Sequence, residues 1–247
     1  MNINITNFRL LKHLSLIIIL LLVQTPCLAN DLPSEYVVLL HGLARTQRSM
    51  NKMEKRLSEE GFGVINVGYP SRSKTIEELA EETIPNSIML CREQGAQRIH
   101  FVTHSMGGIM VRYYLKDHHI PELGRVVMLS PPNQGSQIVD VFGDYLVFKW
   151  FNGPAGQQLG TGEECLPKNL GSVAFELGVI SGNSSINLLL SLVIPGEDDG
   201  KVSTVNAKVD GMKDFMIIPS SHAFIMRNRD AINQTTAFLK HGSFKRE

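Results

Sequence analysis

The stretch RIHFVTHSMGGIMVRYYLKD, residues 98–117, joins an apolar, β-branched run to a helical pattern through one serine. Residues 98–104 predict a buried strand, and Met106–Asp117 predict a helix. A tight turn between the two would hold the hydroxyl of Ser105 above the edge of a sheet, where it can act as a nucleophile. An ordinary serine in a strand-to-helix connection is the alternative. A base and a carboxylate elsewhere in the chain would favour the nucleophile over the ordinary serine.

The turn around Ser105 departs at one position from the strict pattern Gly-x-Ser-x-Gly. Gly107 provides the second glycine, which lets the strand and the helix approach closely, but Thr103 stands where the first glycine is usual. Threonine is small, so we expect it to affect the packing of the turn more than its chemistry. The motif alone is weak evidence for a nucleophile.

Strand patterns and helical patterns alternate along the chain. The expected strands are 36–40, 61–70, 98–104, 125–132, 173–182 and 214–220, and the expected helices are 49–60, 76–94 with a kink or break at Pro85, 106–117 and Ala223–Leu239. Strands separated by helices need crossover connections, which make the strands parallel and place helices on both faces of the sheet. The sequence therefore predicts an α/β fold with a mostly parallel central sheet.

Length and charge narrow the function classes. At 247 residues with 43% hydrophobic residues, the chain is long enough for one domain with a sizeable core. Its formal net charge is zero, which argues against a nucleic-acid partner, and no feature indicates a protein partner. The spacing of histidines and carboxylates does not suggest a metal site, and no phosphate-binding glycine loop is present. We expect no cofactor and no metal.

Residues 1–29 are typical of a signal peptide. Basic residues precede the apolar run Leu14–Val23, and Ala29 ends a small-x-small cleavage pattern. We therefore expect export to the periplasm or out of the cell, with 30–247 as a single domain. An N-terminal membrane anchor is the alternative, although the apolar run is short for a membrane span.

Two cysteines, Cys91 and Cys165, remain after the expected cleavage. An oxidising compartment allows them to form a disulfide. The sequence does not give their separation, so a disulfide and two free thiols both remain open.

Residues 136–171 interrupt the alternation of strands and helices. They contain the only tryptophan of the chain, several phenylalanines and then a loop rich in glycine and proline. We expect this segment to form a short cap insertion over the sheet, with the aromatic part at 140–151 as a wall or lid for an apolar group. The alternative is a surface excursion whose aromatic side chains pack into the main core.

A nucleophilic serine needs a base and a carboxylate that orients the base. His222 follows the last expected strand, so it reaches the same edge of the sheet as Ser105. Asp199 lies in the sequence PGEDDGKVS, where Asp-Gly makes a tight turn, and Asp198 beside it is the alternative carboxylate. The order Ser, Asp, His along the chain is the one that a nucleophile on such a turn predicts.

Two backbone amides are candidates for stabilising an oxyanion on the reacting carbonyl. Leu43 follows His41-Gly42 directly after the first expected strand, where glycine lets the backbone approach a ligand. Met106 opens the helix after the serine, where the helix dipole favours negative charge. We expect His41 to shape this loop and His104 to be structural.

The motifs VVLLHGL, FVTHSMGG, EDDGKVS and IIPSSHAFI resemble the α/β-hydrolase superfamily, and within it the small bacterial lipases and esterases. LSPPNQGS is similar to a segment of those lipases and of inositol-deacylase-like proteins. The resemblance covers residues 36–240 and implies the α/β-hydrolase fold. Carried over by position, it makes Ser105 the nucleophile, His222 the base and Asp199 the acid. The oxyanion donors are then the amides of Leu43 and Met106.

This resemblance implies a serine hydrolase that cleaves carboxylic esters through an acyl-enzyme, and the signal-peptide pattern of residues 1–29 implies its export. The substrate would be a small-molecule or lipid ester, and peripheral contact with a lipid surface would fit a lipid substrate. Acyl transfer, or hydrolysis of an amide or thioester, could use the same residues. A hydrolase-like binding protein without turnover is the alternative from a different class.

Overall fold

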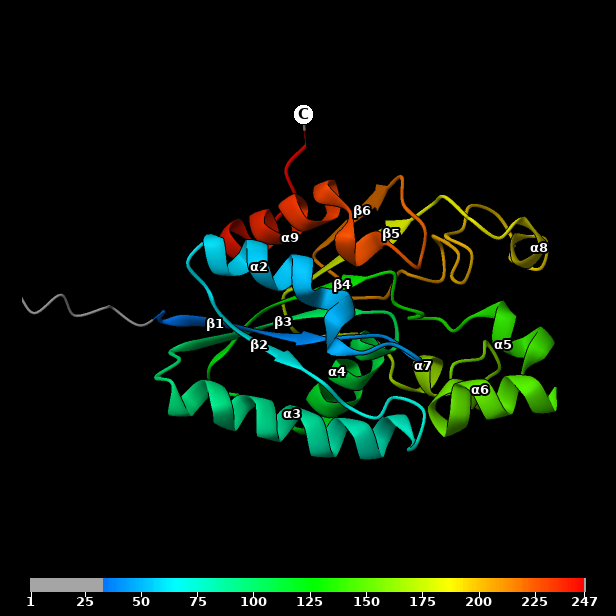
Figure 1. Ribbon diagram of the computed structural model, residues 1–247, viewed down its shortest axis with the longest axis horizontal. Coiled ribbons are helices and arrows are strands. Elements are labelled where there is room, and N and C mark those ends of the chain that lie inside the picture. The colour runs from blue at the N-terminus through cyan, green and yellow to red at the C-terminus, as the bar shows by residue number, and fades with distance from the viewer. Residues whose placement is uncertain (1–32, 247) are drawn as a thin grey trace, which may run out of the picture. The chain divides into compact units, whose positions relative to one another are not determined.

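The computed structural model describes residues 33–246. The expected signal peptide, 1–29, and its cleavage site at Ala29 lie outside the described residues. The described strands form one sheet in the order β2-β1-β3-β4-β5-β6, and every neighbouring pair is parallel (Figure 1). Their bounds are Glu35–Leu40 (β1), Gly63–Val67 (β2), Arg98–His104 (β3), Leu123–Leu129 (β4), Leu177–Gly182 (β5) and Asp214–Ile218 (β6).

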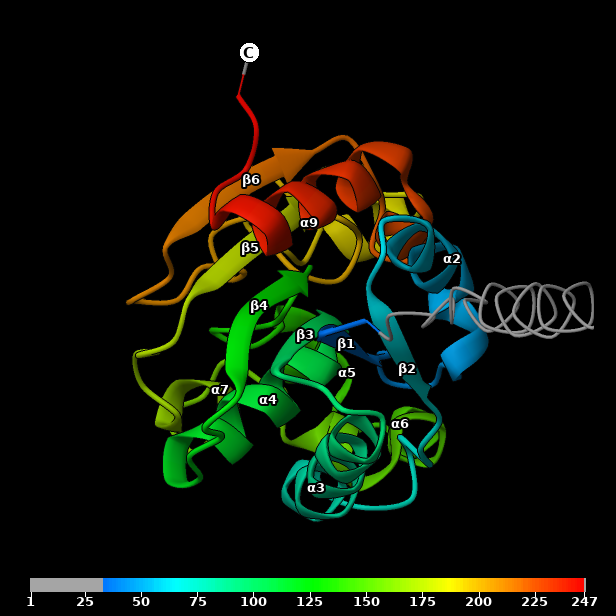
Figure 2. The ribbon, with the colours of Figure 1, turned by 90° about the vertical axis from the view of Figure 1, so that its left-hand side faces the viewer.

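Helices cover both faces of the sheet, as Figures 1 and 2 show. Two of them, α3 (Ile76–Glu93) and α4 (Met106–Asp117), pack on one face, and α2 (Asn51–Glu59) and α9 (Arg229–His241) pack on the other. Successive β3 side chains alternate between the two apolar cores, because a strand turns each side chain to the opposite face. The predicted α/β architecture is confirmed.

Four short helices lie beyond the carboxyl ends of the strands (Figure 1). The segment 136–171 contains three of them, α5 (Gln137–Phe142), α6 (Leu146–Gln157) and α7 (Leu166–Asn169). The fourth, α8 (Leu188–Ser191), lies between β5 and β6 and was not expected from the sequence. We call 136–171 the cap segment.

Pro85 does not break α3, because the helix continues to Glu93, so of the expected kink or break the break is excluded. The last helix begins at Arg229 instead of Ala223, because the Asn228 side chain caps it by accepting hydrogen bonds from two amides of its first turn. Residues 225–227 before it form a short 3₁₀ helix.

The two cysteines are not paired. Cys91 is buried in α3, and Cys165 is half-buried just before α7. Burial raises the pKa of the Cys91 thiol to about 11, so this thiol is protonated at neutral pH. Both are free thiols, and the disulfide left open by the sequence is absent from this structure.

Strand order explains why the site forms where it does. β1 has β2 on one side and β3 on the other, so the chain leaves β1 in one direction and returns past it to form β3. Ligands bind at such switch points, beyond the carboxyl ends of the strands. Leu40 at the end of β1 pairs with Thr103 near the end of β3. The loop with Leu43 and the turn with Ser105 therefore emerge side by side.

Candidate active site

Ser105 adopts a strained backbone conformation between β3 and α4. Its φ of 52° and ψ of −123° lie in a region that residues with a side chain rarely occupy. The Ser105 amide donates to the Leu129 carbonyl over 2.9 Å, and the Gly108 amide donates to the Ser105 carbonyl over 2.9 Å. A Cβ on Gly107 would come within 2.8 Å of the Leu40 carbonyl oxygen, so this position needs glycine. The turn thus has the geometry of a nucleophile elbow.

Thr103 fits this turn because a second glycine faces it. A Cβ on Gly108 would lie 3.2 Å from the Thr103 hydroxyl and 3.0 Å from the Met128 sulfur. The missing side chain at Gly108 thus leaves the space that threonine fills. The Thr103 hydroxyl is fully buried and has no hydrogen-bond partner among residues 33–246. A polar atom buried in this way costs stability.

His222 links the serine to a carboxylate. Its Nε2 lies 3.0 Å from Ser105 Oγ, and its Nδ1 lies 2.9 Å from Asp199 Oδ2. With a proton on Nδ1, the imidazole donates to the carboxylate and accepts from the serine hydroxyl. The His222 amide also donates to the Asp199 carbonyl over 2.9 Å, which ties the two loops together through the backbone. The structure therefore brings the three predicted side chains into one hydrogen-bonded chain.

Asp199 is buried and held on both oxygens. Its Oδ1 accepts from the Lys201 amide at 3.0 Å and from the Val202 amide at 2.9 Å. Burial raises the pKa of Asp199, but the electrostatic interaction with His222 and the hydrogen bonds from His222 and Ser130 outweigh it and lower the pKa below its usual value. The carboxylate is therefore ionised at neutral pH and holds the imidazole in one tautomer.

Asp198, the alternative carboxylate, points elsewhere. Its Oδ1 accepts from the Ser191 hydroxyl at 2.8 Å and from the Gly200 amide at 2.6 Å. These bonds shape the loop between α8 and the Asp199 turn. Of the two neighbouring carboxylates, Asp199 is the one that contacts His222.

The loop after β1 lies directly against the serine. A Cβ on Gly42 would be 3.1 Å from Ser105 Cβ and 2.7 Å from His104 Nδ1. The amides of Leu43 and Met106, the two expected oxyanion donors, donate to no other group among residues 33–246. Met106 is the first residue of α4, where an amide has no partner within the helix.

His41 fixes the shape of this loop. Its ring stacks on Tyr69 with centroids 4.0 Å apart, and Nδ1 donates to the Gly42 carbonyl over 2.9 Å. The Tyr69 hydroxyl donates to the His41 carbonyl. Burial lowers the pKa of His41, so the ring is neutral. Its hydrogen bonds connect the Gly42 carbonyl to the Tyr69 amide.

A cavity of about 580 Å³ opens over Ser105. Its wall is mostly apolar. It is built from the loops that carry Ser105, Asp199 and His222, from the cap segment, and from residues 183–197 around α8, which we call the α8 loop. The apolar side chains are Leu43, Pro132, Ile138, Val139, Phe142, Tyr145, Val147, Phe148, Phe151, Leu159, Ile186, Leu190, Val202 and Ala223. A volume and lining of this kind suit an organic ligand with a substantial apolar part.

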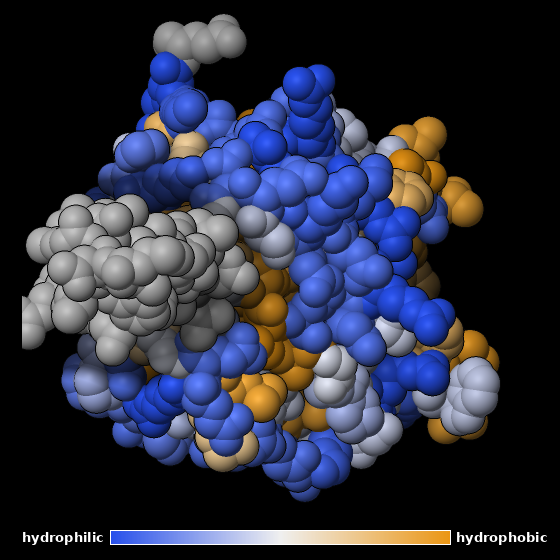
Figure 3. Space-filling view, turned by 60° about the vertical axis from the view of Figure 1, so that its left-hand side comes forward, coloured by the Kyte–Doolittle hydropathy of each residue, from blue (hydrophilic) through white to orange (hydrophobic). Residues whose placement is uncertain are grey.

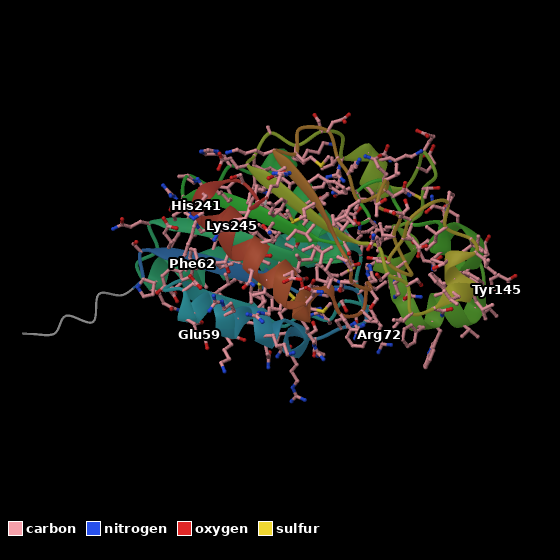
Figure 4. All side chains as sticks on the ribbon, turned by 90° about the horizontal axis from the view of Figure 1, so that it is seen from above. Glu59, Phe62, Arg72, Tyr145, His241 and Lys245 are labelled. Carbon is pink, nitrogen blue, oxygen red and sulfur yellow. The ribbon has the colours of Figure 1, made fainter. Side chains whose placement is uncertain are left out.

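Exposed apolar side chains lie on the cap segment and around α8, and four of them, Tyr145, Val147, Phe151 and Ile186, also line the cavity. We call the whole set the apolar rim, which consists of Tyr145, Leu146, Val147, Trp150, Phe151, Ile186, Leu188, Leu189 and Leu192. In Figure 4, Tyr145 lies at the opposite end of the molecule from His241 and Lys245. The face visible in Figure 3 is largely hydrophilic, and hydrophobic side chains gather in a central strip and at its right-hand margin. Large exposed apolar side chains gathered on neighbouring segments are typical of an interaction site.

Sequence analysis missed three contributions to this site. The α8 loop has no regular pattern of apolar residues, and only its leucine run at 188–190 indicates an apolar surface. Ser130, at the end of β4 with a φ of 47°, helps to lower the pKa of Asp199. Arg45 and Lys201 line the cavity, and exposed basic residues in loops give no signal on their own.

Residues 33–246 contain no group of three histidine, cysteine or acidic side chains placed to hold a metal ion. Within the same range, no helix combines the length and the hydropathy needed to cross a bilayer.

No protein-family model matches the sequence, and no curated protein matches it. Solved structures do match. The mature lipase BlEst2 of Bacillus licheniformis is 18% identical with a TM-score of 0.63, over 86% of this chain and 93% of that one. The esterase Pf2001 of Pyrococcus furiosus is 16% identical with a TM-score of 0.59, over 84% and 83%. The phospholipase PlaB of Legionella pneumophila is 15% identical with a TM-score of 0.61, over 83% and 63%.

At these identities the likeness shows the fold alone. It agrees with the parallel six-stranded sheet described above. The chain therefore has the α/β-hydrolase fold, in the form found in lipases and esterases.

Proposed function

We propose that this protein is a serine hydrolase of carboxylic esters. The observation that carries the proposal is the hydrogen-bonded chain from Ser105 through His222 to Asp199, which opens onto an apolar cavity. A base next to the serine, and a carboxylate next to the base, are what a serine hydroxyl needs to become a nucleophile at neutral pH. The likeness to lipases and esterases supports the same reaction class.

In this proposal each group of the site has a role. His222 Nε2 accepts the proton of Ser105 Oγ as the oxygen attacks the ester carbonyl, and the ionised Asp199 stabilises the imidazolium that forms. The amides of Leu43 and Met106 donate to the oxyanion. The imidazolium then protonates the departing alcohol, and water activated by His222 hydrolyses the acyl-enzyme. The same residues could pass the acyl group to another acceptor in place of water.

The cap segment gives the acyl chain its place. Phe142, Phe148 and Phe151 belong to the cavity wall, and the apolar rim adjoins them. We infer that the acyl chain lies against these aromatic side chains and that the cap segment acts as a lid. Gly153, with a φ of 63°, separates the two parts of α6 and supplies a bend there.

The apolar rim supports a further part of the proposal. Exposed aromatic and leucine side chains around a cavity mouth favour contact with a lipid surface, where they would leave water. We infer that the enzyme meets its substrate at such a surface, after export of the chain from the cytoplasm.

Covalent labelling tests the proposal. A fluorophosphonate reacts with serine hydrolases because it mimics the carbonyl that the activated oxygen attacks. We expect it to label the wild type and not Ser105→Ala. Ser49→Ala is the matched control, since Ser49 is also buried but donates to Thr46 in a loop outside the site. If the folded wild type is not labelled, the protein is not a serine hydrolase.

A series of p-nitrophenyl esters tests the acyl pocket. We expect kcat/KM to rise from acetate to chains that fill the cavity of about 580 Å³. Activity confined to acetate would exclude the use of the cavity for a long acyl chain.

A further inference from the structure

Two cations line the cavity beside the nucleophile, and neither has an acidic partner. The side chains of Arg45 and Lys201 belong to the cavity wall together with Ser105. Both residues are exposed, and within residues 33–246 neither forms an ion pair. The one acidic residue of the cavity wall is Asp199, which is already bonded to His222 and to two amides. The open part of the site therefore carries positive charge.

Their backbones fix these two residues at the reaction site. Arg45 comes two residues after Leu43, and its amide donates to the Gly42 carbonyl over 3.2 Å. The Lys201 amide donates to Asp199 over 3.0 Å, and its carbonyl accepts from the Ser136 hydroxyl at 2.6 Å. One cation thus follows an expected oxyanion donor, and the other follows the acid. The backbone hydrogen bonds therefore hold both residues in the same loops as Leu43 and Asp199.

The two cations also act on each other and on the site. Desolvation by the atoms around the cavity lowers the pKa of Lys201 although its side chain reaches solvent, the charge of Arg45 lowers this pKa further, and the charge of Asp199 opposes both effects. Both charges contribute to lowering the pKa of His104 behind the nucleophile. An anion that binds between two like charges stabilises both, because it offsets their repulsion.

We propose that Arg45 and Lys201 form a binding subsite for the phosphate of an acyl ester, so that the substrate is a lysophospholipid or phospholipid. This rests on the proposed ester hydrolysis and names its substrate class. Guanidinium and ammonium groups are the side chains that bind phosphate oxygens best, with charge-assisted hydrogen bonds. The acyl chain lies in the apolar part of the cavity, the ester carbonyl lies at Ser105, and the phosphate lies on the alcohol side.

The phosphate takes no part in the bond changes. Ser105 Oγ forms a bond to the acyl carbon, the bond from that carbon to the alcohol oxygen breaks, and the alcohol leaves with the proton that His222 took from the serine. Water then supplies the oxygen and protons that release the fatty acid. The products are a fatty acid and a phosphorylated alcohol. The apolar rim brings the same substrate class within reach, because phospholipids form the surfaces that such side chains contact.

The test compares two substrates with the same acyl chain. One is lauroyl lysophosphatidylglycerol, which carries a phosphate, and the other is uncharged monolauroylglycerol, both below their aggregation concentrations. For the wild type we expect kcat/KM to be higher for the phosphate ester. We expect the ratio of the two kcat/KM values to fall about tenfold in Arg45→Gln and in Lys201→Gln, and further in the double variant. Arg48→Gln is the matched control, an exposed arginine outside the cavity whose loss should leave the ratio unchanged.

Butyryl phosphoglycerol distinguishes a lipid from a small phosphorylated ester. A phosphate preference that holds for the lauroyl substrate supports a phospholipid, and one confined to the butyryl substrate overturns it. A wild-type ratio near one that the variants leave unchanged overturns the phosphate subsite while ester hydrolysis stands. If no ester is hydrolysed and Ser105 is not labelled, the proposed function itself fails.

Discussion

The imidazole of His104 donates from Nε2 to the backbone carbonyl of His222, 3.0 Å away. The two rings are tilted against one another with centroids 4.9 Å apart. His104, the last residue of β3, thereby holds the loop that carries the expected base next to the expected nucleophile, Ser105. Its ring is fully buried, and its Nδ1 has no partner among residues 33–246 and faces Gly42. His104 is a positioning residue that links three parts of the site.

We expect His104→Ala to lower kcat by about tenfold, because His222 loses the hydrogen bond that orients its backbone. KM should change less, since His104 contributes only a small part of the cavity wall. His104→Gln, whose amide can still donate, should recover part of kcat. Steady-state kinetics on p-nitrophenyl butyrate checks this. A purely structural role would lower the yield of active enzyme, as titrated with the fluorophosphonate, and leave kcat per labelled site unchanged.

Folding stability should fall as the pH drops below about 6.5. Burial and the charge of His222 lower the pKa of His104 well below its usual value, so the unfolded chain binds a proton that the folded chain does not. This difference destabilises the fold by up to about 1.4 kcal/mol per pH unit. In urea unfolding at pH 7.5, 6.5 and 5.5, His104→Gln should show a shallower dependence than the wild type. Equal slopes would contradict the neutral, buried state of this ring.

Thr103→Val should stabilise the protein by about 1 kcal/mol, because it removes a buried hydroxyl without a partner and keeps the shape of the side chain. Gly108→Ala should cost about 1–3 kcal/mol, since its Cβ would meet Thr103 and Met128. Thr103→Ala should recover part of that loss in the double variant, and urea unfolding measures this coupling.

Since the turn accommodates threonine, we expect no gain of activity in Thr103→Gly. A gain would show that Thr103 distorts the turn.

Substitutions of the neighbouring residues Asp198 and Asp199 should have different effects on kcat. Asp199→Asn should lower kcat by about 10³-fold or more, because the imidazole loses the anion that fixes its tautomer. Asp198→Asn should lower kcat by less than about tenfold and cost about 1 kcal/mol of stability, since it weakens the bonds to Ser191 and Gly200. Parallel measurements of kcat and urea unfolding compare them. A larger loss of kcat in Asp198→Asn would overturn the assignment of Asp199.

Trp150 reports on lipid contact, because it is the only tryptophan and is 82% exposed. On addition of phosphatidylglycerol vesicles we expect its fluorescence to shift to the blue as the indole leaves water. Replacing Leu188 and Leu192 by serine should weaken the vesicle affinity, since both lie on the apolar rim. Met89→Ser is the control, an exposed apolar residue of α3 away from the rim. An unshifted spectrum at saturating lipid would rule out docking through α6.

Local sequence determined the sheet, its parallel direction and the turn that carries Ser105. Strand and helix patterns depend on neighbouring residues, so 98–117 could be interpreted without the rest of the chain. His222 and Asp199 could be proposed because parallel strands bring their carboxyl ends to one edge. The boundary of the last helix was placed wrongly, because the Asn228 cap competes with an apolar pattern that begins earlier.

Tertiary structure decided that Asp199, and not Asp198, contacts His222, which depends on the direction of two adjacent side chains in one turn. It also decided that Gly108 makes room for Thr103, that the two cysteines stay apart, and that the cap segment and the α8 loop share one cavity. Each of these is a contact between residues distant in the chain or a side-chain direction within a loop. Periodicity carries no information on either, because it records only which face of its own element a residue occupies.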